Sequence, residues 1–333
     1  MAMPNHDEMH DDDDPQAIHV LMSGLVDYAG LFPPAKLAMM PSVQNYAQYL
    51  RTPEAWMLGR FILPVSRLEE FRETSRGLLP KSPYVDEPDG GEPWPISAII
   101  DGDLDENLDS IFAFNHEHEN PKNGLAVVDA IELKVPTTGS GLTGAAWIDD
   151  AIELIPEEVF PFFEIPIFPV GGVAPDFRGM IASLAGADGA AKLRTGGITP
   201  EAFPPAAAVA EFLLACNAAE VPFKATAGLH HACRAHYPLT YEPDAAKGLM
   251  HGFLNVFLAA AFVHAGRADA AMATAILEET DPAAFQFGRE VVRWRNTGLE
   301  LMQLAQARET FALSYGSCSF EEPVQELQRM RVI

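Results

Sequence analysis

The stretches Gly189-Ala-Ala-Lys-Leu-Arg-Thr-Gly-Gly197 and Val221-Pro-Phe-Lys-Ala-Thr-Ala-Gly-Leu-His230 each enclose one lysine in a short apolar run. The alanine-rich segment 201–220 between them is long enough for a helix. A short apolar run, a glycine turn, a helix and a second apolar run predict a βαβ unit with parallel strands. Parallel strands are covered on both faces, so a lysine inside one is unusual. Two such lysines, each just before a glycine turn, indicate a site at the carboxyl end of a sheet.

The composition indicates a globular protein that does not bind nucleic acid. The chain has 333 residues, of which 48% are hydrophobic, and its 47 acidic and 22 basic residues give a net charge of −25. A chain of this length can bury a large core. Its acidity argues against nucleic acid as a partner, because phosphate binding needs a basic face. We therefore expect a small-molecule substrate, with a homo-oligomer as an open alternative for its assembly.

Compartment signals point to the cytoplasm. The three cysteines, Cys216, Cys233 and Cys318, are odd in number and far apart, which does not suit a disulfide framework. The longest apolar stretch, 252–263, is broken by Asn255 and is too short for a bilayer core of about 30 Å. No signal peptide is visible at the N-terminus. We expect a cytoplasmic protein with no membrane partner.

The order of elements predicts a (β/α)8 TIM barrel. Residues 1–16 hold an acidic run and are expected to be a disordered tail, and 17–333 to form a single barrel domain. Regular alternation of strands and helices at this length favours a closed barrel over an open sheet. The expected strands before the two lysine runs are 18–26, 60–65, 96–100, 126–136 and 160–167.

The eighth strand is separated from the seventh by a long segment. We place it at 310–315, before a helix at 321–330, which makes 232–309 a helical insertion with helices at 247–264, 268–279 and 297–307. A rival position for the eighth strand is 284–287.

Residues at strand carboxyl ends face the active site of a TIM barrel. Here these ends bring lysines together with carboxylates and no Cys or His in metal-ligand spacing; His230-His-Ala-Cys-Arg-Ala-His236 fits no standard zinc pattern. A lysine beside other cations in a closed cavity has a lowered pKa and becomes a nucleophile towards carbonyls. A nearby carboxylate can move the protons that imine formation requires. The residue types therefore suit Schiff-base chemistry, and structural ion pairs between the lysines and Glu132 and Glu164 are the alternative.

Several stretches also carry a resemblance. Ala185-Gly-Ala-Asp-Gly-Ala-Ala-Lys-Leu-Arg-Thr-Gly-Gly197 and Phe223-Lys-Ala-Thr-Ala-Gly228 resemble the strand-six and strand-seven motifs of the deoxyribose-phosphate aldolases, a class I, Schiff-base aldolase family of TIM barrels. Leu25-Val-Asp-Tyr-Ala-Gly-Leu-Phe-Pro33 is similar to the opening strand of that family. Asp129-Ala-Ile-Glu-Leu-Lys-Val-Pro136 is similar to its fourth strand, and Tyr315-Gly-Ser-Cys-Ser319 to its last phosphate turn.

The resemblance implies roles for individual residues. Lys192 would be the nucleophile, Lys224 would lower its pKa, Glu132 would relay protons and Asp27 would orient the lysines. No cofactor or metal is implied. From their places at strand ends and in glycine turns, we expect ten residues to contact an anionic substrate, which in that family is phosphorylated: Arg194, Thr195, Gly196, Gly197, Gly228, His230, Lys134, Glu164, Gly316 and Ser317. Arg194, Lys134 and the Ala227-Gly228 pair depart from the family pattern, so we expect a remote relative with its own substrate.

Two other functions remain open from the sequence. The lysines and Arg194 could clamp phosphate or carboxylate groups without an imine, as in phosphoribosyltransferase-type barrels, with a metal held by Glu132 and Glu164. Alternatively, the barrel is non-catalytic and the 232–309 segment forms an interface.

Overall fold

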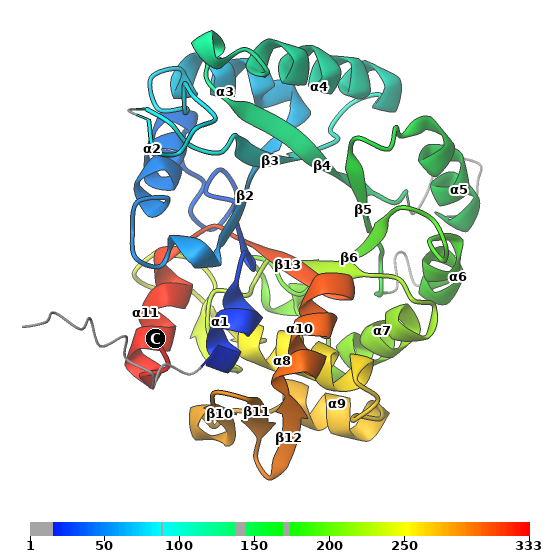
Figure 1. Ribbon diagram of the computed structural model, residues 1–333. Coiled ribbons are helices and arrows are strands. Elements are labelled where there is room, and N and C mark those ends of the chain that lie inside the picture. Colours follow the sequence, from blue (N-terminus) through cyan, green and yellow to red (C-terminus); the bar gives the residue numbers. More distant parts are fainter. Residues whose placement is uncertain (1–15, 88, 137–143, 169–173) are drawn as a thin grey trace, which may run out of the picture.

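The computed structural model describes residues 16–87, 89–136, 144–168 and 174–333. Parallel strands close into a barrel in the order β1-β13-β7-β6-β5-β4-β3-β2, which confirms the predicted TIM barrel (Figure 1). The barrel strands are β1 (Val26–Tyr28), β2 (Leu58–Pro64), β3 (Trp94–Ile99), β4 (Ala126–Lys134), β5 (Phe160–Glu164), β6 (Ala190–Arg194), β7 (Phe223–Thr226) and β13 (Ala312–Ser317).

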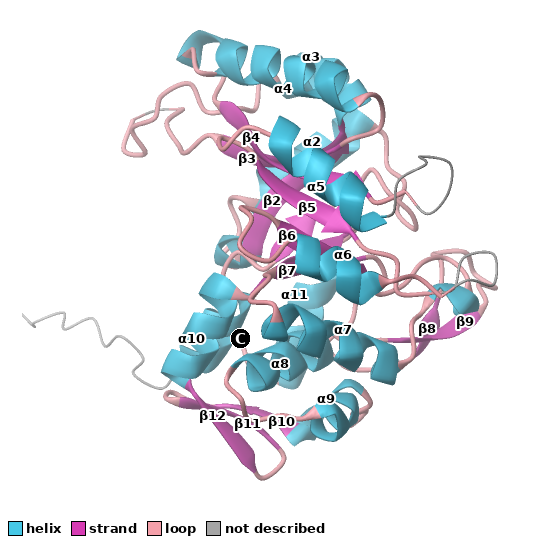
Figure 2. Cartoon of the chain, turned by 90° about the vertical axis from the view of Figure 1, so that its right-hand side faces the viewer, coloured by secondary structure: helices cyan, strands magenta, loops and turns pink. Residues whose placement is uncertain are grey.

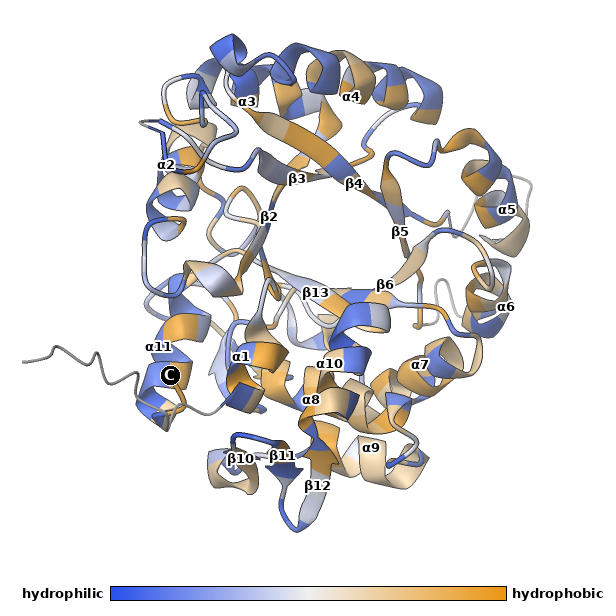
Figure 3. Cartoon of the chain, viewed as in Figure 1, coloured by the Kyte–Doolittle hydropathy of each residue, from blue (hydrophilic) through white to orange (hydrophobic). Residues whose placement is uncertain are grey.

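Helices surround the barrel, and hydrophilic and hydrophobic residues alternate along several of them (Figure 3). In α4 (Leu104–His118), Leu108, Ile111 and Phe114 recur at helical spacing and are buried, as expected for an amphipathic helix on a sheet. The other helices of the ring are α2 (Met39–Tyr49), α3 (Leu68–Ser75), α5 (Gly144–Leu154), α6 (Phe177–Ser183), α7 (Ala206–Ala218) and α11 (Glu321–Met330).

The first predicted strand, 18–26, is wrong over most of its length. Residues Gln16–Met22 form helix α1, and only Val26–Tyr28 form the strand. The physical reason is visible in the burial pattern: Ala17, Ile18, Leu21 and Met22 are the buried residues, and their spacing is that of one helix face. The predicted disordered tail lies outside the described residues except for Gln16, which begins α1.

The eighth strand is β13, so the prediction at 310–315 is confirmed and the rival at 284–287 is wrong. The rival segment forms β10 (Phe285–Phe287), which pairs with β11 (Val291–Trp294) and β12 (Thr297–Glu300) in a separate antiparallel sheet.

The segment between β7 and β13 is mixed, whereas we expected helices alone. It contains the hairpin β8 (Ala235–Pro238) and β9 (Lys247–Met250), the β10–β12 sheet, and helices α8 (Phe253–His264), α9 (Ala270–Leu277) and α10 (Leu301–Thr310). The helices predicted at 247 and 297 therefore begin later, because β9 and β12 take up their first residues. Figure 2 shows β8 and β9 on the side of the carboxyl ends of the barrel strands. Within the described residues, no helix combines the length and the apolar character needed to cross a membrane.

The barrel interior has two layers of different character. On the amino side, Ala130, Phe162 and Ala190 form an apolar cluster with Phe160 and Leu313, separate from the large core between strands and helices. On the carboxyl side, charged residues replace the apolar ones. Lys224 marks the boundary, since its Nζ lies 4.9 Å from the centre of the Phe162 ring. The apolar layer thus supports a charged layer at the end of the barrel where TIM-barrel active sites lie.

Candidate active site

A chain of ion pairs crosses the carboxyl end of the barrel. Its charges alternate in sign, and its members come from β1, β7, β4, β6, β5 and again β6: Asp27, Lys224, Glu132, Lys192, Glu164 and Arg194. The strand register brings them together, because Lys192 is the Cα partner of both Lys224 and Glu164. The structure therefore places all four predicted catalytic residues in one connected network.

Glu132 is the bridge of this network. Its Oε2 lies 2.7 Å from Lys192 Nζ and its Oε1 lies 2.7 Å from Lys224 Nζ. The hydroxyl of Ser97 donates to the same Oε1 at 2.8 Å. Burial raises the pKa of Glu132, but the two lysines outweigh it and hold that pKa well below its usual range. The carboxylate is thus ionised and bound on both oxygens.

Lys192 is held between two carboxylates. Besides Glu132, its Nζ contacts Glu164 Oε2 at 2.8 Å. Burial lowers the pKa of Lys192, but the carboxylates outweigh burial and the net pKa is raised. This corrects our expectation that Lys224 lowers it: the neighbouring cation is neutralised by Glu132 and Asp27, so the contacting carboxylates dominate. In the resting site Lys192 is an ammonium.

Lys224 is completely buried and more deeply enclosed. Its Nζ contacts Asp27 Oδ2 at 2.7 Å. Asp27 is itself fixed, because Oδ2 accepts from the Ser314 hydroxyl at 2.7 Å and Oδ1 accepts from the Arg60 backbone N–H at 2.8 Å. A Cβ at Gly59 would lie 2.4 Å from Asp27 Oδ1, so that position requires glycine.

Glu164 joins the buried network to the rim. Its Oε1 accepts from Arg194 Nε at 3.0 Å, and about half of the Arg194 side chain is exposed. Burial raises the pKa of Glu164, but Lys192 and Arg194 bring it down to about 2. Because cations already contact the oxygens of both Glu132 and Glu164, these residues offer no free carboxylate pair for the metal considered above.

A cavity of about 410 Å³ opens above the network. Lys192 and Glu132 line it, whereas Lys224 and Asp27 do not. Lys134, predicted as a substrate contact, is exposed and lines the same cavity without an ion pair to a described residue. The other lining residues are Ala29, Phe32, Pro33, Ile62, Ile99, Leu133, Glu164, Arg194, Gly197, Ile198, Thr226, Ala227, His230, Gly316 and Cys318. Of the two buried lysines, Lys192 is therefore the one that a small molecule in the cavity can reach.

The predicted glycine turns are packed against each other. A Cβ at Gly196 or at Gly228 would lie 3.0 Å from the Cα of the other glycine, and 2.5 or 2.7 Å from the Phe203 ring. Thr195 is also used internally, since its hydroxyl donates to the Ala227 carbonyl at 2.7 Å. These contacts explain why glycine stands at both positions without any ligand.

His230 anchors a second polar cluster at the cavity wall. Its Nδ1 lies 3.3 Å from Glu322 Oε2, 3.4 Å from Ser317 Oγ and 3.9 Å from Cys318 Sγ. Burial lowers the pKa of His230, but Cys318 and Glu322 raise it to about 10, so the imidazole is protonated at neutral pH. The next histidine, His231, contacts a different carboxylate, with its Nδ1 3.3 Å from Glu326 Oε1. Within the described residues, no cluster of three or more His, Cys, Asp or Glu side chains could hold a metal ion.

Sequence reasoning missed Ser97, Ser314 and Glu322. The two serines lie in the middle of β3 and β13, and nothing near them in the sequence marks them. Glu322 had a usable signal, because it stands in the first turn of the helix that follows the last barrel strand.

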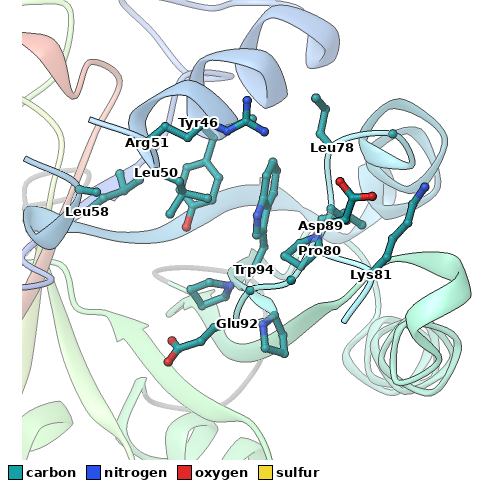
Figure 4. A pocket seen from close by; sticks show the side chains of 18 of the residues that line it. Tyr46, Leu50, Arg51, Leu58, Leu78, Pro80, Lys81, Asp89, Glu92 and Trp94 are labelled. Carbon is teal, nitrogen blue, oxygen red and sulfur yellow. The ribbon is translucent and has the colours of Figure 1, made fainter. Parts of the chain in front are cut away.

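A larger cavity lies elsewhere, with a volume of about 650 Å³. It is lined by α2, the starts of β2 and β3, and the segment before β3. Figure 4 shows Trp94 in its middle, with Tyr46 on one side and Asp89 and Lys81 on the other. It lies at the amino ends of the strands and contains none of the charged network, so we place the candidate active site in the smaller cavity.

No protein-family model, curated protein or solved structure matches this chain.

Proposed function

We propose that the protein is a lyase of the class I aldolase type, in which Lys192 forms a Schiff base with a small carbonyl substrate. The observation that carries this proposal is the setting of Lys192. Its amine lies at the wall of the cavity, 2.7 Å from Glu132 and 2.8 Å from Glu164. A carbonyl carbon that reaches this amine meets a nucleophile with a proton acceptor on either side.

Imine formation balances without an outside reagent. The Lys192 ammonium gives one proton to Glu132 or Glu164, the free amine attacks the carbonyl carbon, and the oxygen takes that proton to give a carbinolamine. A second proton moves from nitrogen to the hydroxyl through the same carboxylates. Water then leaves as the nitrogen lone pair forms the C=N bond. Ammonium and carbonyl have become a protonated imine and one water, with no net change in charge.

The protonated imine then acts as an electron acceptor. When a carboxylate takes the proton of a β-hydroxyl, the bond between the α and β carbons breaks and its electron pair enters an enamine. The β carbon leaves as a carbonyl product. Protonation of the enamine carbon and hydrolysis return free Lys192. Lys224 holds Glu132 in position for these transfers, and Asp27 in turn holds Lys224. The resemblance to the deoxyribose-phosphate aldolases likewise implies Lys192 as the nucleophile and Glu132 as the proton relay.

Borohydride trapping tests the proposal. Borohydride reduces an imine to a stable secondary amine, so incubation with aldehydes and oxo acids should add the mass of the reduced carbonyl compound to the peptide that contains Lys192. Lys192→Arg should abolish this adduct, while Lys122→Arg, at an exposed position outside the site, should keep it. A folded protein that gives no Lys192 adduct with any carbonyl compound would contradict the proposal.

A clamp for anions without an imine is the second candidate function. It is favoured by the raised pKa of Lys192, which the two carboxylates maintain against burial. Lys192→Arg separates the two functions, because arginine keeps the charge but cannot form an imine. If Lys192→Arg still binds phosphate or carboxylate ligands and retains turnover, the anion-binding function without an imine would be favoured.

A further inference from the structure

The cavity differs in charge from the rest of the protein. The whole chain has a net charge of −25. The cavity wall nevertheless carries four cations, Lys134, Lys192, Arg194 and the protonated His230, against the two carboxylates Glu132 and Glu164. A cationic, partly enclosed wall concentrates anions. The question is therefore which anionic group the cavity accepts, and where that group is bound.

The N-terminus of α11 is already occupied by a carboxylate of the protein itself, that of Glu322. Helix N-termini attract negative groups, and here Glu322, in the first turn of α11, supplies the carboxylate. That carboxylate lies 3.3 Å from His230 Nδ1 and 3.1 Å from the Tyr241 hydroxyl. Burial raises the pKa of Glu322, but His230 outweighs it and keeps that pKa below its usual range. A second anion at this position would face a charged carboxylate.

The space beside Glu322 is also too small for a phosphate group. The cavity between the turns after β6 and β7 and Glu322, lined by Gly197, Gly228 and His230, has a volume of only about 30 Å³. A cavity needs about 10–15 Å³ of such volume to hold one water molecule, so this one has room for roughly two. Phe203 fills the space behind Gly196 and Gly228. The negative charge of Glu322 and the small volume beside it therefore both disfavour binding of a phosphate group at this position.

The opposite rim offers two exposed cationic groups, one of which, Arg194, also contacts Glu164. Lys134 and Arg194 end β4 and β6, on either side of β5 and its Glu164. Lys134 is exposed, and about half of the Arg194 side chain is exposed. Arginine and lysine side chains both bind carboxylates through charge-assisted hydrogen bonds. The wall of the same cavity also has an apolar part, which includes Phe32, Ile62 and Ile198.

We propose that the substrate is a non-phosphorylated oxo acid with an apolar body, whose carboxylate binds between Lys134 and Arg194, and that Glu322 excludes phosphorylated compounds. This inference rests on the proposed Schiff-base function for its carbonyl group. The carboxylate at the rim leaves the carbonyl free to meet Lys192 deeper in the cavity. The apolar body then covers Phe32, Ile62 and Ile198.

The experiment has two arms. In the first, borohydride trapping compares 4-phenyl-2-oxobutanoate, the neutral 3-phenylpropanal and glyceraldehyde 3-phosphate. In the second, calorimetry measures binding of three compounds without a reactive carbonyl: 3-phenylpropanoate, 3-phenylpropyl phosphate and 3-phenylpropanol. The variants are Arg194→Gln, Lys134→Gln and Glu322→Gln, with Lys122→Gln as a matched loss of an exposed lysine outside the site.

We expect the oxo acid to label Lys192 and the phosphorylated aldehyde not to do so. Arg194→Gln and Lys134→Gln should each weaken the binding of 3-phenylpropanoate about tenfold, as the loss of one charge-assisted hydrogen bond implies. Both variants should reduce Lys192 labelling by 4-phenyl-2-oxobutanoate more than labelling by the neutral 3-phenylpropanal. Glu322→Gln should increase labelling by the phosphorylated aldehyde, and Lys122→Gln should behave as the wild type.

The two arms separate the two proposals. Equal or stronger labelling by glyceraldehyde 3-phosphate, or tighter binding of 3-phenylpropyl phosphate than of 3-phenylpropanoate, overturns the inference and leaves the Schiff-base function intact. Undiminished 3-phenylpropanoate binding in Arg194→Gln and Lys134→Gln also overturns it. If no compound labels Lys192 but 3-phenylpropanoate binds as expected, the Schiff-base function fails while the carboxylate site stands.

Discussion

The ends of β6 and β7 present the same residue in two different environments. Lys192 and Lys224 are Cα partners on neighbouring strands, and each amine contacts two carboxylates at 2.7 or 2.8 Å. Yet Lys192 lines the cavity, whereas Lys224 lies over the Phe162 ring and has no exposed surface. Ion pairing therefore does not distinguish the two residues. What distinguishes them is that a small molecule in the cavity can contact Lys192 but not Lys224.

This difference assigns separate tasks to two residues that look alike in the sequence. A buried ion pair is poor evidence for stability alone, because desolvation offsets much of the attraction between the charges. Lys224 is best understood through what it holds, since Asp27 and Glu132 both depend on it for charge balance. Lys192 shares Glu132 with it but lines the cavity, so a small molecule can contact its amine.

Replacing each lysine by methionine should separate these tasks most strongly. We expect Lys224→Met to lower the free energy of unfolding by about 3–5 kcal/mol, because it leaves Asp27 buried without a cation. Lys192→Met should cost only about 1–2 kcal/mol, since Glu132 keeps Lys224 and Glu164 keeps Arg194. Denaturant unfolding of both variants gives the comparison. Equal losses would show that access to the cavity does not distinguish the lysines.

Acid should weaken the Lys192 side of the network. Glu164 has a folded pKa of about 2 against an ordinary value of 4.5, because the lysine and arginine contacts outweigh burial. A lowered pKa stabilises the fold at pH values above the ordinary value, and that stability is lost as the pH falls from 4.5 towards 2. In the wild type, this carboxylate should lower the free energy of unfolding by roughly 3 kcal/mol between pH 6 and pH 2. Glu164→Gln should lack this contribution.

The measurement is the free energy of unfolding from pH 6 to pH 2 in both proteins. Glu278→Gln, an exposed carboxylate away from the site, controls for net charge. Parallel curves for the wild type and Glu164→Gln would mean that Glu164 is not paired in solution.

The same carboxylate should set the pH at which Lys192 reacts. Because the pKa of Lys192 is raised, the free amine is scarce at neutral pH, and labelling should still increase as the pH rises towards the ordinary lysine value of 10.5. Glu164→Gln removes one of the two carboxylates that raise it. We expect the pH profile of borohydride-dependent labelling to shift to lower pH, because the pKa of Lys192 falls when one of these carboxylates is lost.

Labelling rates for one aldehyde across pH 6 to 10 measure this shift, again with Glu278→Gln as the control. An unchanged profile, with labelling still confined to Lys192, would show that Glu132 alone controls the proton on this amine.

The sequence could predict the barrel and the four central residues because their signals are local. Each lysine stands inside an apolar run, and Glu132 stands in a strand pattern. The sequence could not predict the direction of the pKa shift, which depends on which oxygens face which amine. It also misassigned 18–26, where a buried helix face and a buried strand have similar compositions.

The two serines that bind the carboxylates inside the barrel, Ser97 and Ser314, could not be predicted from the sequence for a different reason. Ser97 and Ser314 face the network only because strand register and closure turn them inward, and a serine in a strand has no distinctive neighbours. Their contribution is nevertheless measurable, since each donates its hydroxyl to a carboxylate that contacts Lys224.

These serines give the smallest and most local test of the two environments. We expect Ser314→Ala and Ser97→Ala each to lower the free energy of unfolding by about 1–2 kcal/mol, because each removes one hydrogen bond to a buried charge. Ser110→Ala, whose hydroxyl only contacts the backbone of its own helix, should change it by less than about 0.5 kcal/mol. Lys192 labelling should survive Ser314→Ala, because Ser314 reaches only Asp27 on the Lys224 side. Loss of labelling in that variant would mean that the enclosed half of the network also controls the reactive amine, and the division between the two lysines would then fail.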